Sequence, residues 1–378
     1  MLIPEVKLHD AGAVPLRTPE RVPAAAAQSS RQLENYLHHV ELALREFFTA
    51  SKLRGQALTP RFARLWESLE ATTDGGKRFR PRLVWTACQG LGGADLSTTA
   101  SVGAAFELLH TALIVHDDVI DRDFIRRGRP NLAGLYLAQA LDAGLPVAEA
   151  EHRAMSVGVV GGDVALVNAY RLIDHAVSGS VRDRLLEIMD EAVLASAAGE
   201  LLDIEYSVCS AGLMVEDVIA MDRLKTAVYS FEAPLKAGAV LAGAGQQTIA
   251  AIGQAGRSMG IAYQIIDDLL GVFGDEAGTG KSALGDVREG KRTVLINHAS
   301  RAPQFPAIAA HLGNPELTPE DAEEVRSLLI LSGSRDYAQR LARSFGDQAR
   351  SRLQRPDIPQ PLRFELEQIV SSVLTRTR

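Results

Sequence analysis

Apolar residues recur at three- and four-residue spacing along almost the whole chain, and this pattern constrains the fold more than any other feature. The clearest example runs from about Ser97 to Arg122. Its apolar stripe is Val102, Ala105, Phe106, Leu109, Leu113, Val119 and Ile120. This spacing marks one face of an α-helix, whereas the period-two alternation of strands is almost absent. Further helices are expected at about 155–178, 181–207, 215–242 and 249–273, with a set from 319 onward. We therefore predict an all-α fold, a single helical bundle around a central cavity.

The N-terminal residues differ from this pattern. Residues 1–27 carry scattered Pro, Ala and Gly without sustained periodicity, so we expect a flexible N-terminal arm. Ser29, followed by Gln32, is expected to cap the first helix. Residues 28–378 are then one catalytic domain, because the motif residues run from Gly75 to Lys291. Loops are expected at 127–130, 144–146 and 278–280.

Composition narrows the class of protein. With 46% hydrophobic residues the chain can bury a large core, and a net charge of −7 gives no broad basic field for nucleic acid. Cys88 and Cys209 lie far apart in apolar segments, so we expect buried thiols rather than a disulfide. No secretory signal and no membrane span are expected, which favours a soluble cytoplasmic protein.

The first acidic motif ends the clearest helix. Asp117 and Asp121 are four positions apart, so their carboxylates project from one helical face. Convergent carboxylates repel each other unless a cation lies between them, and Mg²⁺ accepts a few carboxylates while leaving positions for water and phosphate. The alternative is an acidic helix end that faces water.

Arginines follow directly, at Arg126, Arg127 and Arg129. Carboxylates for a metal next to guanidinium groups suit a diphosphate, whose charge the metal and the arginines share. A surface salt-bridge cluster is the alternative interpretation.

A second acidic pair, Asp267-Asp268, also ends an apolar-striped helix and follows Gln264. Next come Gly278-Thr279-Gly280-Lys281, then Asp286 and Lys291. The lysines can hold phosphate as point charges, although a glycine-rich turn with lysine is often only a turn. This is not a P-loop, because no glycine stands at Asp275, five positions before Gly280.

Two further basic elements complete the pattern. The cations of Gly75-Gly76-Lys77-Arg78-Phe79-Arg80-Pro81, namely Lys77, Arg78 and Arg80, could cradle another anion or simply form a solvated helix start. Lys225-Thr226 interrupts an apolar helical stretch, where a lysine either reaches an anion or extends its amine to water.

In this order, the elements resemble the trans-prenyltransferase family, the polyprenyl diphosphate synthases, over about Gln32–Asn297. The resemblance implies that Lys77, Arg80, His110 and Arg127 bind isopentenyl diphosphate. It implies that the allylic diphosphate is bound by Arg126, Lys225, Thr226, Gln264, Lys281 and Lys291. Asp117, Asp121 and Asp267 would be the magnesium ligands, with Asp118, Asp268 and Asp286 acting through water or in a second shell. The resemblance further implies three magnesium ions per active site with substrate bound, and a homodimer.

One position departs from the family. The usual second motif is DDxxD, but Asp267-Asp268-Leu269-Leu270-Gly271 ends in glycine. We expect activity to survive with altered metal affinity. Asp275, eight positions after Asp267, is a partial substitute.

The implied chemistry is ionisation of the allylic diphosphate, followed by attack of the isopentenyl double bond on the cation. Magnesium with Arg126, Lys225 and Lys281 would neutralise the departing diphosphate, so the catalytic set is Asp117, Asp121, Arg126, Lys225, Asp267 and Lys281. No side chain is an obvious general base, and the departing diphosphate would take the proton.

Product length is expected to depend on residues one and two turns before Asp117. Ala112 and Leu113 are not aromatic, so the growing tail should pass C15, while Leu109, with Leu108 and Phe106, could stop it. We predict a C20 product, geranylgeranyl diphosphate. Farnesyl diphosphate or a longer product is the alternative.

Three other functions share parts of this pattern. A class I terpene cyclase needs no isopentenyl diphosphate pocket. Residues 75–81 indicate such a pocket and therefore argue against a cyclase. An HD-type metal phosphohydrolase, suggested by His116-Asp117, needs further histidine ligands that do not cluster here. A non-catalytic synthase subunit typically loses the first-motif aspartates, which this chain keeps.

Overall fold

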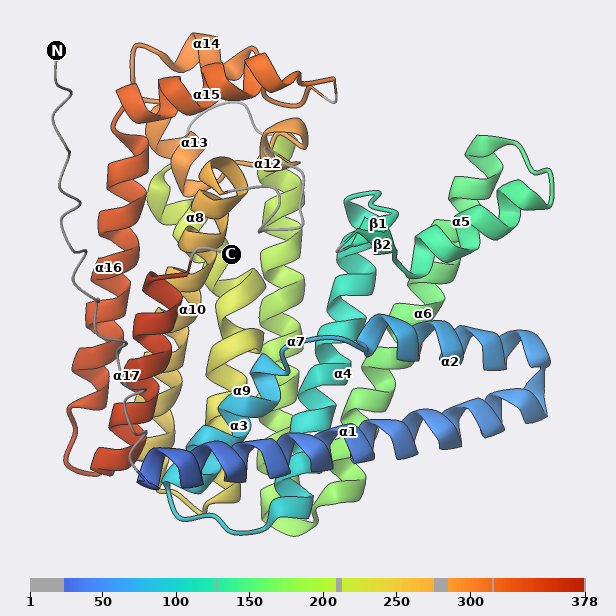
Figure 1. The fold of residues 1–378 in the computed structure, drawn as a ribbon, viewed down its shortest axis with the longest axis vertical. Coiled ribbons are helices and arrows are strands. Elements are labelled where there is room, and N and C mark those ends of the chain that lie inside the picture. The colour runs from blue at the N-terminus through green and yellow to red at the C-terminus, as the bar shows by residue number, and fades with distance from the viewer. Residues whose placement is uncertain (1–23, 127, 209–212, 275–284, 315, 377–378) are drawn as a thin grey trace, which may run out of the picture.

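The computed structural model describes residues 24–126, 128–208, 213–274, 285–314 and 316–376. Nearly all of this is helical, which confirms the all-α prediction (Figure 1). The first half contains α1 (Ala24–Leu58), α2 (Pro60–Thr73), α3 (Phe79–Gly90), α4 (Leu96–Ile120), α5 (Leu132–Asp142), α6 (Val147–Ala176) and α7 (Gly179–Val208). The second half contains α8 (Val215–Asp222), η1 (Arg223–Glu232), α9 (Ala233–Leu241), α10 (Gln246–Phe273), α12 (Gly285–Arg288), α13 (Val294–Ala299), α14 (Phe305–Ala309), α15 (Pro319–Leu331), α16 (Ser334–Leu353) and α17 (Gln360–Leu374). The α4, α7 and α10 helices run through the middle of the bundle, with α1 crossing one end and α14 and α15 at the other (Figure 1).

The α4 helix carries the first acidic motif and is buried over most of its length. The Asp95 carboxylate caps its start by accepting a hydrogen bond from the Thr98 amide. Its most extensive packing is against α6, where glycines let the helices approach closely. A Cβ added at Gly162 would collide with the His116 ring, and one at Gly158 would collide with Val119. This close contact fixes the end of α4 that holds Asp117.

The helical stretch from Val215 to Leu241 was expected to be regular, but its middle is a π-helix, η1. This wider turn is rare and occurs frequently at functional sites. It lies against α7 at Gly199, where an added Cβ would collide with the Lys225 backbone. The absence of a side chain at Gly199 therefore lets Lys225 approach α7 closely.

Helix α1 begins earlier than the sequence suggested. It starts at Ala24, so Ser29 lies inside the helix and the prediction that it caps the N-terminus is wrong. Its hydroxyl instead donates to the Glu365 carboxylate of α17 at 3.1 Å. The cap pattern was misleading because a serine in a helix can also make a tertiary hydrogen bond.

The loops near 127 and 144 lie between helices, as expected. The first also contains two short strands that were not expected, β1 (Ile125–Arg126) and β2 (Arg129–Pro130), paired antiparallel. Cys88 is a buried free thiol, as predicted. Cys209 and the loop at 278–280 lie outside the described residues.

Two helices of the described part, α4 and α6, are long and apolar enough to cross a membrane by length and composition. The apolar part of α4 is mostly buried in the bundle, while that of α6 is more exposed. One side of α6 is therefore apolar and exposed. No membrane span was expected, because the sequence has no run of about eighteen uncharged apolar residues.

Candidate active site

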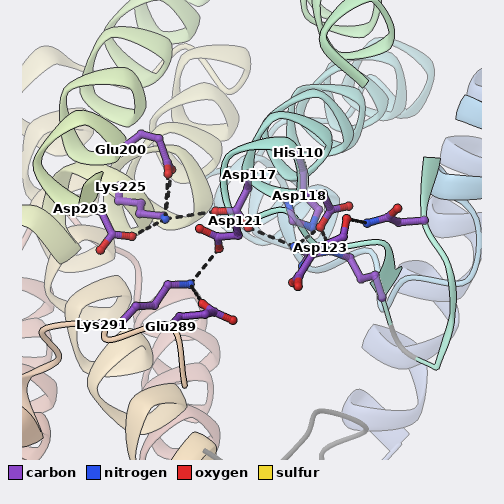
Figure 2. Close-up of polar contacts among 12 residues, drawn as sticks. His110, Asp117, Asp118, Asp121, Asp123, Glu200, Asp203, Lys225, Glu289 and Lys291 are labelled. Carbon is purple, nitrogen blue, oxygen red and sulfur yellow. Dashed lines mark hydrogen bonds and ion pairs between the residues drawn. The ribbon is translucent and has the colours of Figure 1, made fainter. Parts of the chain in front are cut away.

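Asp117, at the end of α4, lies between two cations (Figure 2). The Lys225 Nζ lies 3.1 Å from its Oδ1, and the Arg126 Nη2 lies 3.1 Å from its Oδ2. Burial raises the pKa of this carboxyl, but the charges of Lys225, Lys291 and Arg126 outweigh burial and hold the pKa below its usual value. Asp117 is therefore an ionised carboxylate in a cationic environment.

The carboxylates around Lys225 explain why an apolar helical stretch contains a lysine. Besides Asp117, its amine contacts Glu200 at 3.1 Å and Asp203 at 2.7 Å, both on α7. Burial lowers its pKa, but these carboxylates raise it well above the usual value. The amine stays charged and lies among carboxylates, where an incoming diphosphate or metal can exchange with it.

Arg126, from β1, also holds Asp118. Its Nη2 lies 2.6 Å from the Asp118 Oδ1 and 3.1 Å from Asp117. Burial raises the pKa of Asp118 to about 6, against the opposing effect of the guanidinium. The short hairpin of β1 and β2 thus brings a guanidinium back over the motif that precedes it.

Asp121 follows the last residue of α4 and faces the other side of the site. Its Oδ2 lies 2.9 Å from the Lys291 Nζ, which also contacts Glu289 at 2.7 Å (Figure 2). The two lysines therefore approach the first motif from different segments of the chain, η1 and the turn after α12.

The second motif lies on α10 and connects to η1. Thr226 donates to the Gln264 Oε1 at 3.0 Å, and the Gln264 amide donates to the Asp268 Oδ1 at 2.9 Å. The Asp267 Oδ1 lies 2.8 Å from the Arg376 Nη1, and this guanidinium lies over the Tyr263 ring at 4.7 Å. Thr226 and Gln264 are thus hydrogen-bonded to each other, and their assignment to the allylic diphosphate stays a prediction.

Two carboxyls near this motif are buried with one oxygen lacking a hydrogen-bond partner among the described residues. They are Asp268 on α10 and Asp222 at the end of α8. Burial and their neighbouring carboxylates raise the pKa of both. Buried oxygens of this kind are costly unless a cation or hydrogen bond meets them, so these residues fit a cation-binding environment.

The basic element of residues 75–81 runs into the start of α3 and contacts η1. The Arg80 Nη2 donates to the Tyr229 hydroxyl at 3.1 Å and the Ser230 hydroxyl at 2.7 Å. The His110 Nδ1 lies 3.4 Å from the same Tyr229 hydroxyl. Arg80 and His110, 30 positions apart, therefore meet at one tyrosine. Lys77 is exposed.

Arg78 does not belong to this cationic surface. It is buried, with φ 48°, and donates to Glu41 at 2.5 Å, to the Thr73 carbonyl at 2.6 Å and to Glu107 at 3.2 Å. The interpretation that the cations of residues 77–80 could cradle an anion does not extend to Arg78, because Glu41 and the buried Glu107 engage its guanidinium.

The residues predicted to set product length differ in burial. Ala112 and Leu109 are fully buried, whereas Leu113 is partly buried. Leu113 stands one turn before Asp117, while Ala112 stands one turn before His116, which faces α6. The two candidates therefore lie on different sides of α4, and their roles stay predictions.

Several residues of the site were not found from the sequence, chiefly Glu200, Asp203, Asp222, Tyr229 and Glu289. Isolated acids on amphipathic helices look the same whether they face water or a lysine. The spacing of Glu200 and Asp203 on one helical face was the available signal. Arg127, Lys281 and Asp275 lie outside the described residues.

The arrangement joins carboxylates that suit magnesium to cations that suit phosphate. Asp117 lies on α4, Asp121 follows the last residue of α4 and Asp267 lies on α10. Oxygen ligands of this kind with open positions for water are what Mg²⁺ prefers. Lys225, Arg126 and Lys291 lie among the same carboxylates. An all-helical bundle with this site defines a class of enzymes that act on isoprenoid diphosphates.

Comparisons with known proteins agree. The polyprenyl synthetase family model matches residues 63–329, so the chain belongs to the polyprenyl synthetase family and is a prenyltransferase. Geranylfarnesyl diphosphate synthase of Aeropyrum pernix is 32% identical over 293 residues, 76% of this chain and 86% of the relative. Geranylgeranyl diphosphate synthase of Sulfolobus acidocaldarius is 31% identical over 279 residues, covering 72% of this chain and 78% of the relative.

A solved structure of a similar protein has the same fold. The crystal structure of geranylgeranyl pyrophosphate synthase from Corynebacterium glutamicum, complexed with isoprenyl diphosphate and magnesium, superposes with a TM-score of 0.84. It is 30% identical, and the match covers 91% of this chain and 99% of that one. Family membership favours the prenyltransferase over the terpene cyclase and phosphohydrolase interpretations.

Proposed function

We propose that this protein is a magnesium-dependent short-chain trans-prenyl diphosphate synthase that condenses isopentenyl diphosphate with allylic diphosphates to give geranylgeranyl diphosphate. The observation that carries the proposal is Asp117, held between Lys225 and Arg126 at 3.1 Å each. Carboxylates for the metal and cations for the diphosphate are thus in direct contact.

The allylic diphosphate is expected to take the place of the carboxylates on these cations. Lys225 and Lys291 are charged, and Arg126 presents a planar guanidinium that matches phosphate oxygens. Asp117, Asp121 and Asp267 would hold magnesium, which would supply Lewis-acid stabilisation of the departing diphosphate. Lys281, which lies outside the described residues, is assigned to the same diphosphate.

Isopentenyl diphosphate is assigned to Lys77, Arg80, His110 and Arg127. Support comes from Arg80 and His110, which share the Tyr229 hydroxyl. The Arg80 guanidinium also lies over the Tyr229 ring at 4.8 Å, which fixes its orientation. Tyr229 is therefore expected to hold both side chains ready for the diphosphate.

A C20 product is supported by the relatives whose printed names include geranylgeranyl diphosphate synthase. The geranylfarnesyl relative keeps a longer product as the alternative. Leu109, Ala112 and Leu113 remain the residues that we expect to set the length.

A cytoplasmic homodimer is also part of the proposal. The α7 helix exposes Leu194, Leu201 and Val208 at seven-residue spacing, and α6 exposes Val160 and Val167. Exposed apolar stripes of this kind are costly in water and suit a second apolar surface. A dimer formed through α6 and α7 would account for the exposed apolar side of α6.

The test is to incubate the purified protein with Mg²⁺, labelled isopentenyl diphosphate and dimethylallyl, geranyl or farnesyl diphosphate, and to separate the products by chromatography. We expect geranylgeranyl diphosphate as the main product. Absence of label incorporation with every starter would reject catalysis and favour the non-catalytic subunit, whereas a C15 or C25 product would reject only the length.

A further inference from the structure

A buried ion cluster lies at the C-terminal end of the π-helix η1, outside the residues assigned to the substrates. The Glu232 side chain is only 2% exposed, and the Arg257 guanidinium of α10 donates to its two oxygens at 2.7 and 2.8 Å. The Lys236 Nζ lies 2.8 Å from the Oε1 of the same carboxylate. Burial raises the pKa of Glu232, but the hydrogen bonds from Arg257 and Lys236 outweigh burial and hold the pKa below its usual value. Glu232 is therefore a charged carboxylate that joins η1 to α10.

The backbone changes its hydrogen-bond pattern next to this cluster. The Ala233 amide donates to the Val228 carbonyl, five positions back, which is the wide turn of a π-helix. The following residue, Pro234, has no amide hydrogen to donate to a carbonyl of η1. The ladder of backbone hydrogen bonds is thus interrupted directly after η1 ends, and the ion cluster ties the chain to α10 beside this interruption.

The η1 helix also lies directly against the backbone of α10. A Cβ added at Gly256 would lie 3.2 Å from the Glu232 Cα, so the two helices approach closely beside Arg257. Near the other end of η1, the Thr226 hydroxyl donates to Gln264 at 3.0 Å. The position of η1 along α10 is therefore fixed by one polar contact near each end.

The last residues of η1 contact the start of α3. The Tyr229 and Ser230 hydroxyls accept hydrogen bonds from the Arg80 Nη2 at 3.1 and 2.7 Å. The Phe231 ring packs edge-to-face against Phe79, with the ring centroids 4.9 Å apart. The C-terminal half of η1 therefore sets the orientation of Arg80.

We propose that Glu232 is a positioning residue for the isopentenyl diphosphate site. Its ion cluster holds the C-terminal half of η1, where the Tyr229 and Ser230 hydroxyls orient Arg80. The inference rests on the proposed function, because it concerns the site assigned to that substrate. The allylic site depends less on Glu232, since two carboxylates of α7 contact Lys225 at the other end of η1.

Substitutions in the cluster test this proposal through the Michaelis constants of the two substrates. Glu232→Gln keeps the shape of the side chain and removes its charge. We expect KM for isopentenyl diphosphate to rise about tenfold, because a small displacement of a positioned group is costly. KM for the allylic diphosphate should stay within about twofold of the parent. Arg257→Gln, which breaks the cluster at its half-exposed cation, should shift the constants in the same direction and covers the case in which Glu232→Gln disturbs folding.

Calorimetric titration of isopentenyl diphosphate into each full-length variant gives the same comparison without turnover. The matched control is Glu191→Gln, which removes an exposed carboxylate of α7 that contacts Lys236 at 3.3 Å. It should leave both constants unchanged, because exposed ion pairs contribute little.

A double-mutant cycle with Arg80→Lys tests whether Glu232 acts through Arg80. In the Arg80→Lys background, Glu232→Gln should raise KM for isopentenyl diphosphate by less than about threefold, because the contact that Glu232 positions has already been lost.

An unchanged KM for isopentenyl diphosphate in both Glu232→Gln and Arg257→Gln would overturn the proposal. So would an equal rise in the allylic KM, or a full tenfold effect of Glu232→Gln in the Arg80→Lys background. Arg80→Lys alone separates this failure from that of the proposed function. If it raises KM for isopentenyl diphosphate while Glu232→Gln does not, only the role of Glu232 fails. If neither variant alters this constant, the assignment of the isopentenyl diphosphate site is wrong.

Discussion

Replacing Arg78 by methionine should destabilise the protein by about 3–5 kcal/mol, the usual cost of breaking a buried ion pair by removing one partner. The side chains of Arg78 and Glu107 are only 6% and 7% exposed, and the second oxygen of Glu107 has no hydrogen-bond partner among the described residues. Methionine fills much of the space but leaves Glu107 without a cation. Glu41 adds less, because its side chain is 41% exposed and water can solvate it.

The expected change in melting temperature follows from the size of the chain. At about 2.1 cal/mol/K per residue, unfolding 378 residues carries an entropy of about 0.8 kcal/mol/K. A loss of about 3–5 kcal/mol then lowers Tm by about 4–6 °C. Differential scanning calorimetry measures this shift, and Arg82→Met, an exposed arginine one turn further along α3, should change Tm by less than about 1 °C.

The same substitution should affect the binding of isopentenyl diphosphate. Arg78 sits between Lys77 and Arg80 but faces the interior, so it orients the turn without touching the substrate. We expect KM for isopentenyl diphosphate to rise about tenfold, equivalent to about 1.4 kcal/mol, with kcat and the allylic KM nearly unchanged. Adding Glu107→Gln should recover part of the lost stability. A Tm for Arg78→Met equal to that of the parent, or no recovery in the double variant, would refute the ion-pair argument.

Further substitutions test the site, the product length and the assembly. Asp117→Ala and Asp121→Ala should each lower turnover at least about a hundredfold with native circular dichroism, because each removes charge stabilisation at the metal; turnover near that of the parent would exclude them as ligands. Ala112→Phe should shorten the main product to C15 with turnover largely kept. An unchanged product from a folded Ala112→Phe enzyme would assign that residue to helix packing instead. Leu201→Asp should convert the proposed dimer to monomers in sedimentation velocity, whereas an unchanged sedimentation coefficient would exclude this face as the interface.

The helices that carry the motifs were predictable because their apolar periodicity is local. The stripe through Val102, Leu109 and Leu113 predicts α4 nearly to its ends. The four-residue spacing of Asp117 and Asp121 likewise depends only on helix geometry. The start of α1 was not predictable in this way, because the Ser29 hydroxyl pairs with Glu365, 336 positions away.

The partners of the site cations were not predictable either, because they too lie far away in the sequence. Nothing near Lys225 in the sequence indicates that Glu200 and Asp203 surround its amine, and the π-helix that carries it has no distinct periodicity. For Arg78, the neighbouring residues in the sequence were misleading. Its neighbours Lys77 and Arg80 suggested a shared surface, but a left-handed backbone at Arg78 turns it into the protein.

The most direct test of the account is a crystal structure with Mg²⁺, isopentenyl diphosphate and a non-reactive thiolo analogue of the allylic diphosphate. The account predicts magnesium on Asp117, Asp121 and Asp267, with Lys225 moved from Asp117 to the allylic diphosphate and Arg80 on isopentenyl diphosphate. Metal bound elsewhere, or Lys225 still paired with Asp117 while the diphosphate lies outside this cluster, would contradict it.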